Sequence, residues 1–246
     1  MTEDAERSHR FSAGQGVDDD YEEFTLDPAE LSLDPTQVDP VDSHVLTDLL
    51  DEHNVAADQV DVDSLIDVGL SYMGINRYEE ATEAFERAAR FAEEDSLVAQ
   101  EAWTNKGVAH AQLEEFDAAI GAYQEALRID EDGEHAASAE TNLAYALWEF
   151  GRTEEALEHA ERAVEIDPRA PQAWYNRGFF LAERGLTEDA LNAFDNAIRL
   201  GMRSAEVLEE KAMALEELGR TEEAQEVVAQ AEDLRAEAEA ELTEDA

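Results

Sequence analysis

The amino-acid sequence predicts an all-α protein made of about five tandem helical hairpins that follow an acidic, disordered N-terminal arm. Three observations predict it: a helix-favouring composition, small residues that recur at a fixed spacing, and a turn motif that recurs with them. Hydrophobic residues make up 43% of the chain and aromatic residues 7%. Alanine, glutamate and leucine are abundant, which favours helices over strands and still allows a core.

Five small residues mark the repeat, and we call them the marker residues: Gly69, Gly107, Ala144, Gly178 and Ala212. An alanine follows each marker after 12 residues: Ala81, Ala119, Ala156, Ala190 and Ala224. A second alanine follows 7 residues later: Ala88, Ala126, Ala163, Ala197 and Ala231. Such regularity is not a chance result, even in an alanine-rich chain. Because small side chains let two antiparallel helices approach closely, each unit is predicted to be a helical hairpin.

The turn inside the hairpin is visible in three units, at residues 149–153, 183–187 and 217–221, each of which contains Gly-x-Thr. The glycine suits a left-handed residue after the first helix. The threonine is expected to cap the second helix, and the acidic residues after it lie where the helix dipole favours them.

The remaining segments are assigned in chain order. Residues 1–42 contain Pro28, Pro35 and Pro40 among acidic and small residues, and are expected to form a disordered arm. Residues 43–61 are expected to hold a short helix, over residues 43–53, and a linker. The repeat domain is predicted over 62–238, with an acidic C-terminal tail at 239–246 and a last helix that extends into it. Its five units are expected at about 62–95, 100–133, 137–170, 171–204 and 205–238. Marker spacings of 38, 37, 34 and 34 residues predict longer helices in the early units.

The fourth unit reads Trp174-x2-Arg177-Gly178-x2-Leu181, then Ala190-x3-Phe194 and Ala197. This pattern resembles the tetratricopeptide repeat family, and the other units match it less completely over about three quarters of the chain. The resemblance implies an α-solenoid with a right-handed superhelical twist, whose first helices line a concave groove for a partner protein. Three basic residues stand where the family usually has leucine: Lys106, Arg177 and Lys211.

The resemblance places two sets of residues in the groove, together with Val108. One is an aromatic cluster of Tyr145, Trp148, Tyr175 and Phe179, and aromatic side chains are enriched where proteins bind one another. The other is a series of asparagines, each two residues before a marker: Asn105, Asn142 and Asn176. An asparagine amide can donate to and accept from a peptide backbone. Two interpretations stay open for both sets, namely partner binding and packing within or between hairpins.

The predicted function is a scaffold or adaptor that binds a peptide or helix of another protein. Two alternatives remain: a regulatory subunit or chaperone-like holder of client chains, and a groove filled by the N-terminal segment of this chain. Neither catalytic residues nor cofactors nor metals are expected, because the six histidines are scattered, cysteine is missing and no phosphate-binding or nucleophile motif occurs. The oligomeric state is left open.

The charge balance excludes two kinds of partner. The chain has 63 acidic and 17 basic side chains and a formal net charge of −46, so nucleic acid and anionic membrane surfaces should repel it. A secretory signal and a run of about 18 apolar residues are both lacking, so a soluble, cytoplasmic protein is expected.

The acid excess, with Lys106 and Lys211 as the only lysines, resembles proteins of salt-accumulating halophiles and suggests a haloarchaeal source. In molar salt the Debye length falls to about 3 Å, which screens the self-repulsion of such a chain. We therefore expect the helicity and the melting temperature to rise from dilute buffer to molar KCl, as measured by circular dichroism. Equal values in both solvents would contradict this prediction.

Overall fold

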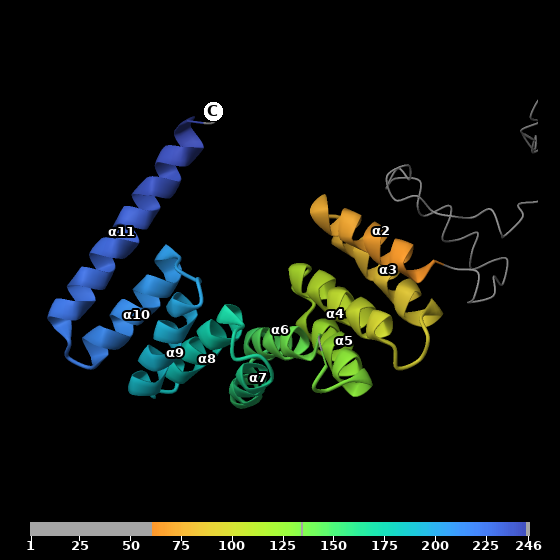
Figure 1. Ribbon diagram of the computed structural model, residues 1–246, viewed down its shortest axis with the longest axis horizontal. Coiled ribbons are helices and arrows are strands. Elements are labelled where there is room, and N and C mark those ends of the chain that lie inside the picture. The colour runs from red at the N-terminus through yellow and green to blue at the C-terminus, as the bar shows by residue number, and fades with distance from the viewer. Residues whose placement is uncertain (1–60, 134, 245–246) are drawn as a thin grey trace, which may run out of the picture. The chain divides into compact units, whose positions relative to one another are not determined.

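The computed structural model describes residues 61–133 and 135–244, and within these ranges the chain forms ten α-helices and no strand (Figure 1). The expected arm at 1–42 and the expected helix at 43–53 lie outside the described residues. The helices follow one another in this order: α2 (Val62–Gly74), α3 (Tyr78–Phe91), α4 (Leu97–Gln112), α5 (Phe116–Ile129), α6 (Ala136–Glu149), α7 (Thr153–Ile166), α8 (Pro171–Glu183), α9 (Thr187–Arg199), α10 (Ala205–Glu217) and α11 (Thr221–Glu244).

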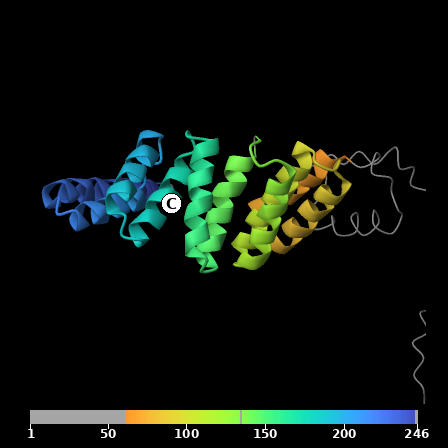
Figure 2. The same cartoon turned by 90° about the horizontal axis from the view of Figure 1, so that it is seen from below.

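Helices pair in chain order into five hairpins, from α2 with α3 (hairpin 1) to α10 with α11 (hairpin 5). The second helix of each hairpin packs against the first helix of the next, as the order of the ribbons in Figure 2 also shows. First helices of neighbouring hairpins contact one another as well, for example α6 with α8. The predicted solenoid of helical hairpins is therefore confirmed.

In three hairpins the marker is a glycine that lies against a buried aromatic ring of the second helix, 16 positions later. A Cβ added to the glycine marker would lie closer than 3.0 Å to that ring. The three pairs are Gly69 with Phe85, Gly107 with Tyr123, and Gly178 with Phe194. In hairpins 3 and 5 the marker is alanine, and the ring is replaced by Ala160 and Val228. A glycine marker is thus paired in sequence with an aromatic residue, and an alanine marker is paired with a smaller side chain.

The three basic residues that replace leucine form ion pairs between hairpins. Each lies one residue before a marker on a first helix and contacts an acidic residue on the second helix of the preceding hairpin. The pairs are Lys106 with Glu86 (3.0 Å), Arg177 with Glu161 (3.7 Å) and Lys211 with Asp195 (2.6 Å). The junction of hairpins 2 and 3 has Leu143 and Gln124 at these positions. The departures from the family pattern are therefore matched by acidic partners in the same repeat register.

All five first helices end in the same turn. A residue with positive φ follows the helix: Asn76, Glu114, Gly151, Gly185 and Gly219. The next backbone N–H donates to a carbonyl five residues earlier, as Arg152 does to Leu147 at 2.8 Å. This is the Schellman arrangement, which satisfies carbonyls at the helix end. The predicted left-handed glycine is confirmed in the three units in which it was expected.

The predicted threonine cap is wrong. Thr153 and Thr187 are the first residues of their helices, and the capping positions are held by Arg152 and Leu186, which make no side-chain capping hydrogen bond. The reason is that the last residue of the Schellman turn, Arg152 or Leu186, is itself the capping residue of the next helix, so the threonine falls one position too late. In its place, Arg152 donates to Glu155 at 2.7 Å, three residues along.

The extra residues of the early units are placed differently in the two junctions. Helix α4 has 16 residues against 13 for α8 and α10, which confirms a longer helix at the first junction. At the second junction they lie mainly in the connection 130–135, so the expectation of a longer helix is wrong there. The last helix, α11, continues to Glu244, which includes most of the expected tail.

The apolar core lies between the helices of the stack and has two parts. One joins hairpin 1 to α4, and the other runs from α5 to α11. In the described ranges, no helix is both long enough and apolar enough to cross a membrane.

Replacing a marker glycine by alanine should destabilise the fold, whereas replacing a solvent-exposed helical glycine should not. We expect Gly107→Ala to lower the unfolding free energy by about 1–3 kcal/mol, because the methyl group would press on the buried Tyr123 ring. Gly121→Ala in α5 is the matched control, since no atom lies within 4 Å of an added Cβ there. It should stabilise the helix by about 0.5–1 kcal/mol. Urea unfolding followed by circular dichroism compares the two, and equal shifts would contradict the packing argument.

Candidate functional site

A stripe of large apolar side chains runs along the first helices, one residue after each marker: Leu70, Val108, Tyr145, Phe179 and Met213. Leu70, Tyr145 and Met213 are 45%, 46% and 51% exposed, while Val108 and Phe179 are half-buried. Since every hairpin repeats this position, the stripe is a regular feature of one face. Apolar residues repeated on one face of a highly charged chain mark it as a candidate binding surface.

The stripe widens into a cavity between α6, α8 and the start of α10, which we call the aromatic pocket. Its volume is about 420 Å³. The residues that line it are Tyr145, Trp148, Glu149, Gln172, Tyr175, Asn176, Phe179, Phe180, Met202, Glu206 and Glu210. All four members of the predicted aromatic cluster are among them, so the structure brings the cluster together.

The rings of the aromatic pocket hold one another in place. Trp148 stacks on the buried Phe180 at 5.1 Å between centroids and meets Phe179 edge-on at 5.2 Å. Tyr175 stacks on Phe179 at 6.4 Å. Tyr145 differs, because its ring contact is with Phe116 of the preceding hairpin, at 6.3 Å. Trp148, Tyr175 and Phe179 therefore pack on the core and line the pocket at once, so the two interpretations of these three residues are not exclusive.

The charged groups at the pocket are all acidic. Glu149, Glu206 and Glu210 line it, and the Tyr175 hydroxyl donates to Glu206 Oε1 at 2.9 Å. Burial raises the pKa of Tyr175, and the acceptor Glu206 raises it further. Burial also raises the pKa of Glu210, with a further contribution from the negative charges of Glu183, Glu206 and Glu209. The pocket thus combines aromatic walls with a rim of closely spaced carboxylates.

The asparagine series is divided by the structure. Asn176 is buried, and its amide nitrogen donates to the Thr141 carbonyl on α6 at 3.1 Å while its oxygen accepts from Gln172 at 2.9 Å. The amide nitrogen therefore serves the contact between hairpins 3 and 4, and the amide oxygen is held by a residue of its own helix, α8. Asn142 lines a different cavity, and Asn105 and Val108 line neither.

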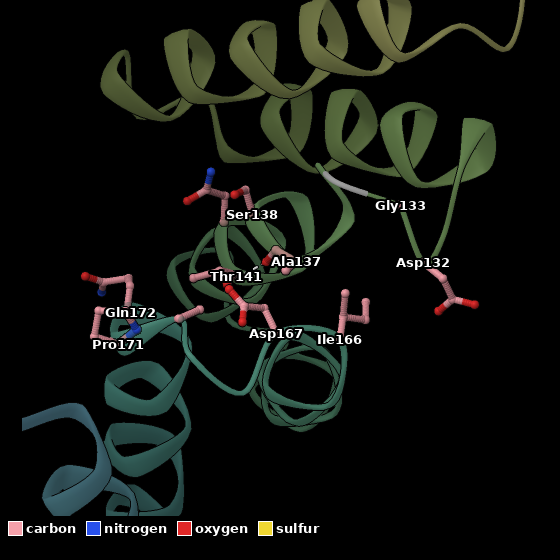
Figure 3. Close-up of a pocket in the computed structure, with 11 residues that line it drawn as sticks. Asp132, Gly133, Ala137, Ser138, Thr141, Ile166, Asp167, Pro171 and Gln172 are labelled. Atoms are coloured by element: carbon pink, nitrogen blue, oxygen red, sulfur yellow. Dashed lines mark hydrogen bonds between the residues drawn. The ribbon is translucent and has the colours of Figure 1, made fainter. Parts of the chain in front are cut away.

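That second cavity, which we call the polar pocket, is drawn in Figure 3 and has a volume of about 520 Å³. Gln172 lines both cavities, so the two pockets adjoin. Ser138 and Thr141 reach it from α6, and Asp132 and Asp167 reach it from the connecting segments (Figure 3). Asp132 accepts from Arg162 at 3.1 Å, and Asp167 accepts from the Arg169 backbone at 2.9 Å. Polar side chains on this side and rings on the other give the surface two chemically distinct halves.

Glu149, Phe180 and Met202 are among the lining residues of the aromatic pocket that sequence reasoning missed. Phe180 is 2% exposed and forms the floor beneath Trp148. Met202 belongs to the connection between α9 and α10, directly after Gly201, whose φ is 105°. This glycine is the available signal, because it marks a sharp turn that carries the next residue back toward the first helices.

In chemical terms the surface can bury apolar groups, stack on planar or cationic groups and exchange hydrogen bonds. No group of three or more His, Cys, Asp or Glu side chains that could hold a metal ion is found among the described residues.

Comparisons with known proteins agree with the repeat. Tetratricopeptide repeat models match residues 62–95, 98–169, 141–201 and 181–239. No curated protein matches the chain. Among solved structures, it is similar to MamA, with a TM-score of 0.59, 16% identity, and coverage of 69% of this chain and 95% of that one. It is also similar to YrrB, described as a TPR protein with an unusual peptide-binding site (0.57, 20%, 77% and 92%). It is similar to pilF of Pseudomonas aeruginosa as well, with a TM-score of 0.59, 22% identity, and coverage of 69% of this chain and 76% of that one. At identities below 25%, these structural similarities show a shared fold alone.

Two asparagine variants separate a structural from a surface role. Asn176→Ala should lower the unfolding free energy by about 1–3 kcal/mol, because it leaves the buried Thr141 carbonyl without this donor. Asn142→Ala, at the half-buried equivalent in hairpin 3, should change it by less than about 0.5 kcal/mol. Thermal and urea unfolding measure both, and a loss of equal size in the two variants would contradict the distinction.

Proposed function

The chain belongs to the tetratricopeptide repeat family, and on this premise we propose that it is a non-catalytic scaffold or adaptor that binds a segment of another protein. The aromatic pocket carries the proposal, because it joins exposed and half-buried rings on the first helices into one preformed cavity. Helix positions hold these rings more precisely than a loop would, which lowers the ordering cost of binding.

The energetics favour a reversible complex. Burial of an apolar or aromatic side chain contributes roughly 1.5–3 kcal/mol, and association costs at least about 4 kcal/mol. Two or three anchors in the aromatic pocket therefore give modest affinity. Tyr145 is the strongest candidate among them, because it is 46% exposed and has the most surface left to bury.

The polar pocket supplies the second part of the proposed site. We assign to Asn142 and Ser138 hydrogen bonds to the backbone of an extended segment, since both amide and hydroxyl groups can donate and accept. Asn105 and Val108 would extend the surface toward hairpin 2. The peptide-binding site named for YrrB is consistent with such a role for a protein of this fold.

We further propose that the protein works in a salt-rich cytoplasm of the haloarchaeal kind. The support is the net charge of −46 with only two lysines, a composition that suits a solvent in which charge repulsion is screened.

Loss of the Tyr145 and Tyr175 rings should abolish partner capture. We expect proteins retained from a native lysate in molar KCl by the wild-type chain to be lost with Tyr145→Ala/Tyr175→Ala. The matched control is Phe150→Ala/Leu186→Ala, which removes two apolar side chains that are 50% and 47% exposed near the hairpin turns. Quantitative mass spectrometry of the retained proteins compares the three chains. If the wild-type chain and Tyr145→Ala/Tyr175→Ala retain the same proteins, the assignment of the binding surface is overturned.

A further inference from the structure

The aromatic pocket carries a charge pattern that defines its partner more closely. Of its lining residues three are glutamates and none is basic. Elsewhere the acidic rim is partly neutralised, since Glu209 pairs with Arg235 at 2.6 Å. Within the described part of the chain, no ion pair is formed by Glu149, Glu206 or Glu210. Negative charge is therefore concentrated beside aromatic rings without a cation of the protein's own.

Two other places in this protein show which group binds between an aromatic ring and a carboxylate. Lys106 Nζ lies 4.9 Å from the centre of the Trp103 ring and 3.0 Å from Glu86. The Arg177 guanidinium lies 5.6 Å from the centre of the Trp174 ring, and its Nε lies 3.7 Å from Glu161. In both places a cation lies over an aromatic ring and is paired with a carboxylate. The aromatic pocket presents the ring and the carboxylate without the cation.

We propose that the partner segment inserts a cationic side chain, arginine in preference to lysine, into the aromatic pocket beside an apolar anchor. The guanidinium stacks on the Tyr145, Trp148 or Tyr175 ring and donates to Glu206 or Glu210. Arginine fits best because its planar group can stack and form paired hydrogen bonds at once. This inference rests on the proposed function and specifies the chemistry of its partner.

Charge also decides against two other occupants. Residues 1–61 carry 18 acidic and 2 basic side chains, so the N-terminal segment of this chain offers few cations for direct contact with the glutamate rim. A second copy, with 63 acidic and 17 basic side chains, offers mainly carboxylates as well. The occupant is therefore a basic segment of a different protein.

The proposal is tested by selecting a displayed random-peptide library on the immobilised full chain in about 1 M KCl. At that salt concentration the Debye length is about 3 Å, so only direct contacts favour one peptide over another. We expect the selected peptides to be enriched in arginine next to a leucine or an aromatic residue. Their Kd, measured on synthetic copies, should rise about tenfold for Glu206→Gln/Glu210→Gln.

A matched control variant makes the result decisive. Glu154→Gln/Glu158→Gln removes two exposed carboxylates of α7 and should leave Kd unchanged within about twofold. The glutamine at position 206 still accepts from Tyr175, so circular dichroism should show both double variants folded. An equal rise in Kd for the two double variants would show that general charge attraction, and not the pocket, binds the peptides, and would overturn the proposal.

The failure of the inference differs from the failure of the proposed function. Selected peptides that lack basic residues but lose binding with Tyr145→Ala/Tyr175→Ala would overturn the cationic partner and leave the aromatic binding surface intact. If the wild-type chain selects no peptide that the tyrosine variant does not also select, both the inference and the proposed function are overturned.

Discussion

The close contact between a marker glycine and the aromatic ring 16 positions later is the constraint on which the packing of hairpins 1, 2 and 4 depends. Where Gly107 faces the Tyr123 ring, the lack of a side chain lets α4 and α5 approach until the ring is buried. Where the marker is Ala144, the residue 16 positions later is Ala160. Because this contact fixes the two helices of a hairpin, it also fixes which face of the first helix packs on neighbours and which one, with Tyr145 and Phe179, is left for other molecules.

The sequence was sufficient for the hairpins, because marker spacing and turn glycines report local geometry. It was insufficient where packing between hairpins decides. Glu140 lies where the family pattern has tryptophan, yet it is buried, 2.5 Å from His159 and 3.3 Å from Arg162 on α7. Pattern alone cannot show that these partners compensate a buried carboxylate. Similarly, Asn176 and Asn142 are equivalent in the repeat, but only Asn176 is enclosed by the neighbouring hairpin.

The part of the candidate site that follows from the repeat register was predictable, and the part that depends on packing between hairpins was not. Tyr145, Trp148, Tyr175 and Phe179 converge because they occupy neighbouring positions of adjacent first helices, which the repeat register reveals. Met202 enters from a connection whose path depends on the turn at Gly201, and Phe180 contributes from beneath as core. The carboxylates add the chemical direction. In the salt-rich solvent that we propose, the acidic surface would also give one pocket the proposed preference for a cationic partner.

The most direct test of the central claim is photo-crosslinking from a benzophenone amino acid placed at position 145 and, in a second protein, at position 150. Tyr145 and Phe150 are both aromatic and are 46% and 50% exposed, but only Tyr145 lines the aromatic pocket. The account predicts a crosslink to a partner protein or selected peptide from position 145 and none from position 150. Equal crosslinking from both positions, or crosslinking from position 150 alone, would contradict it.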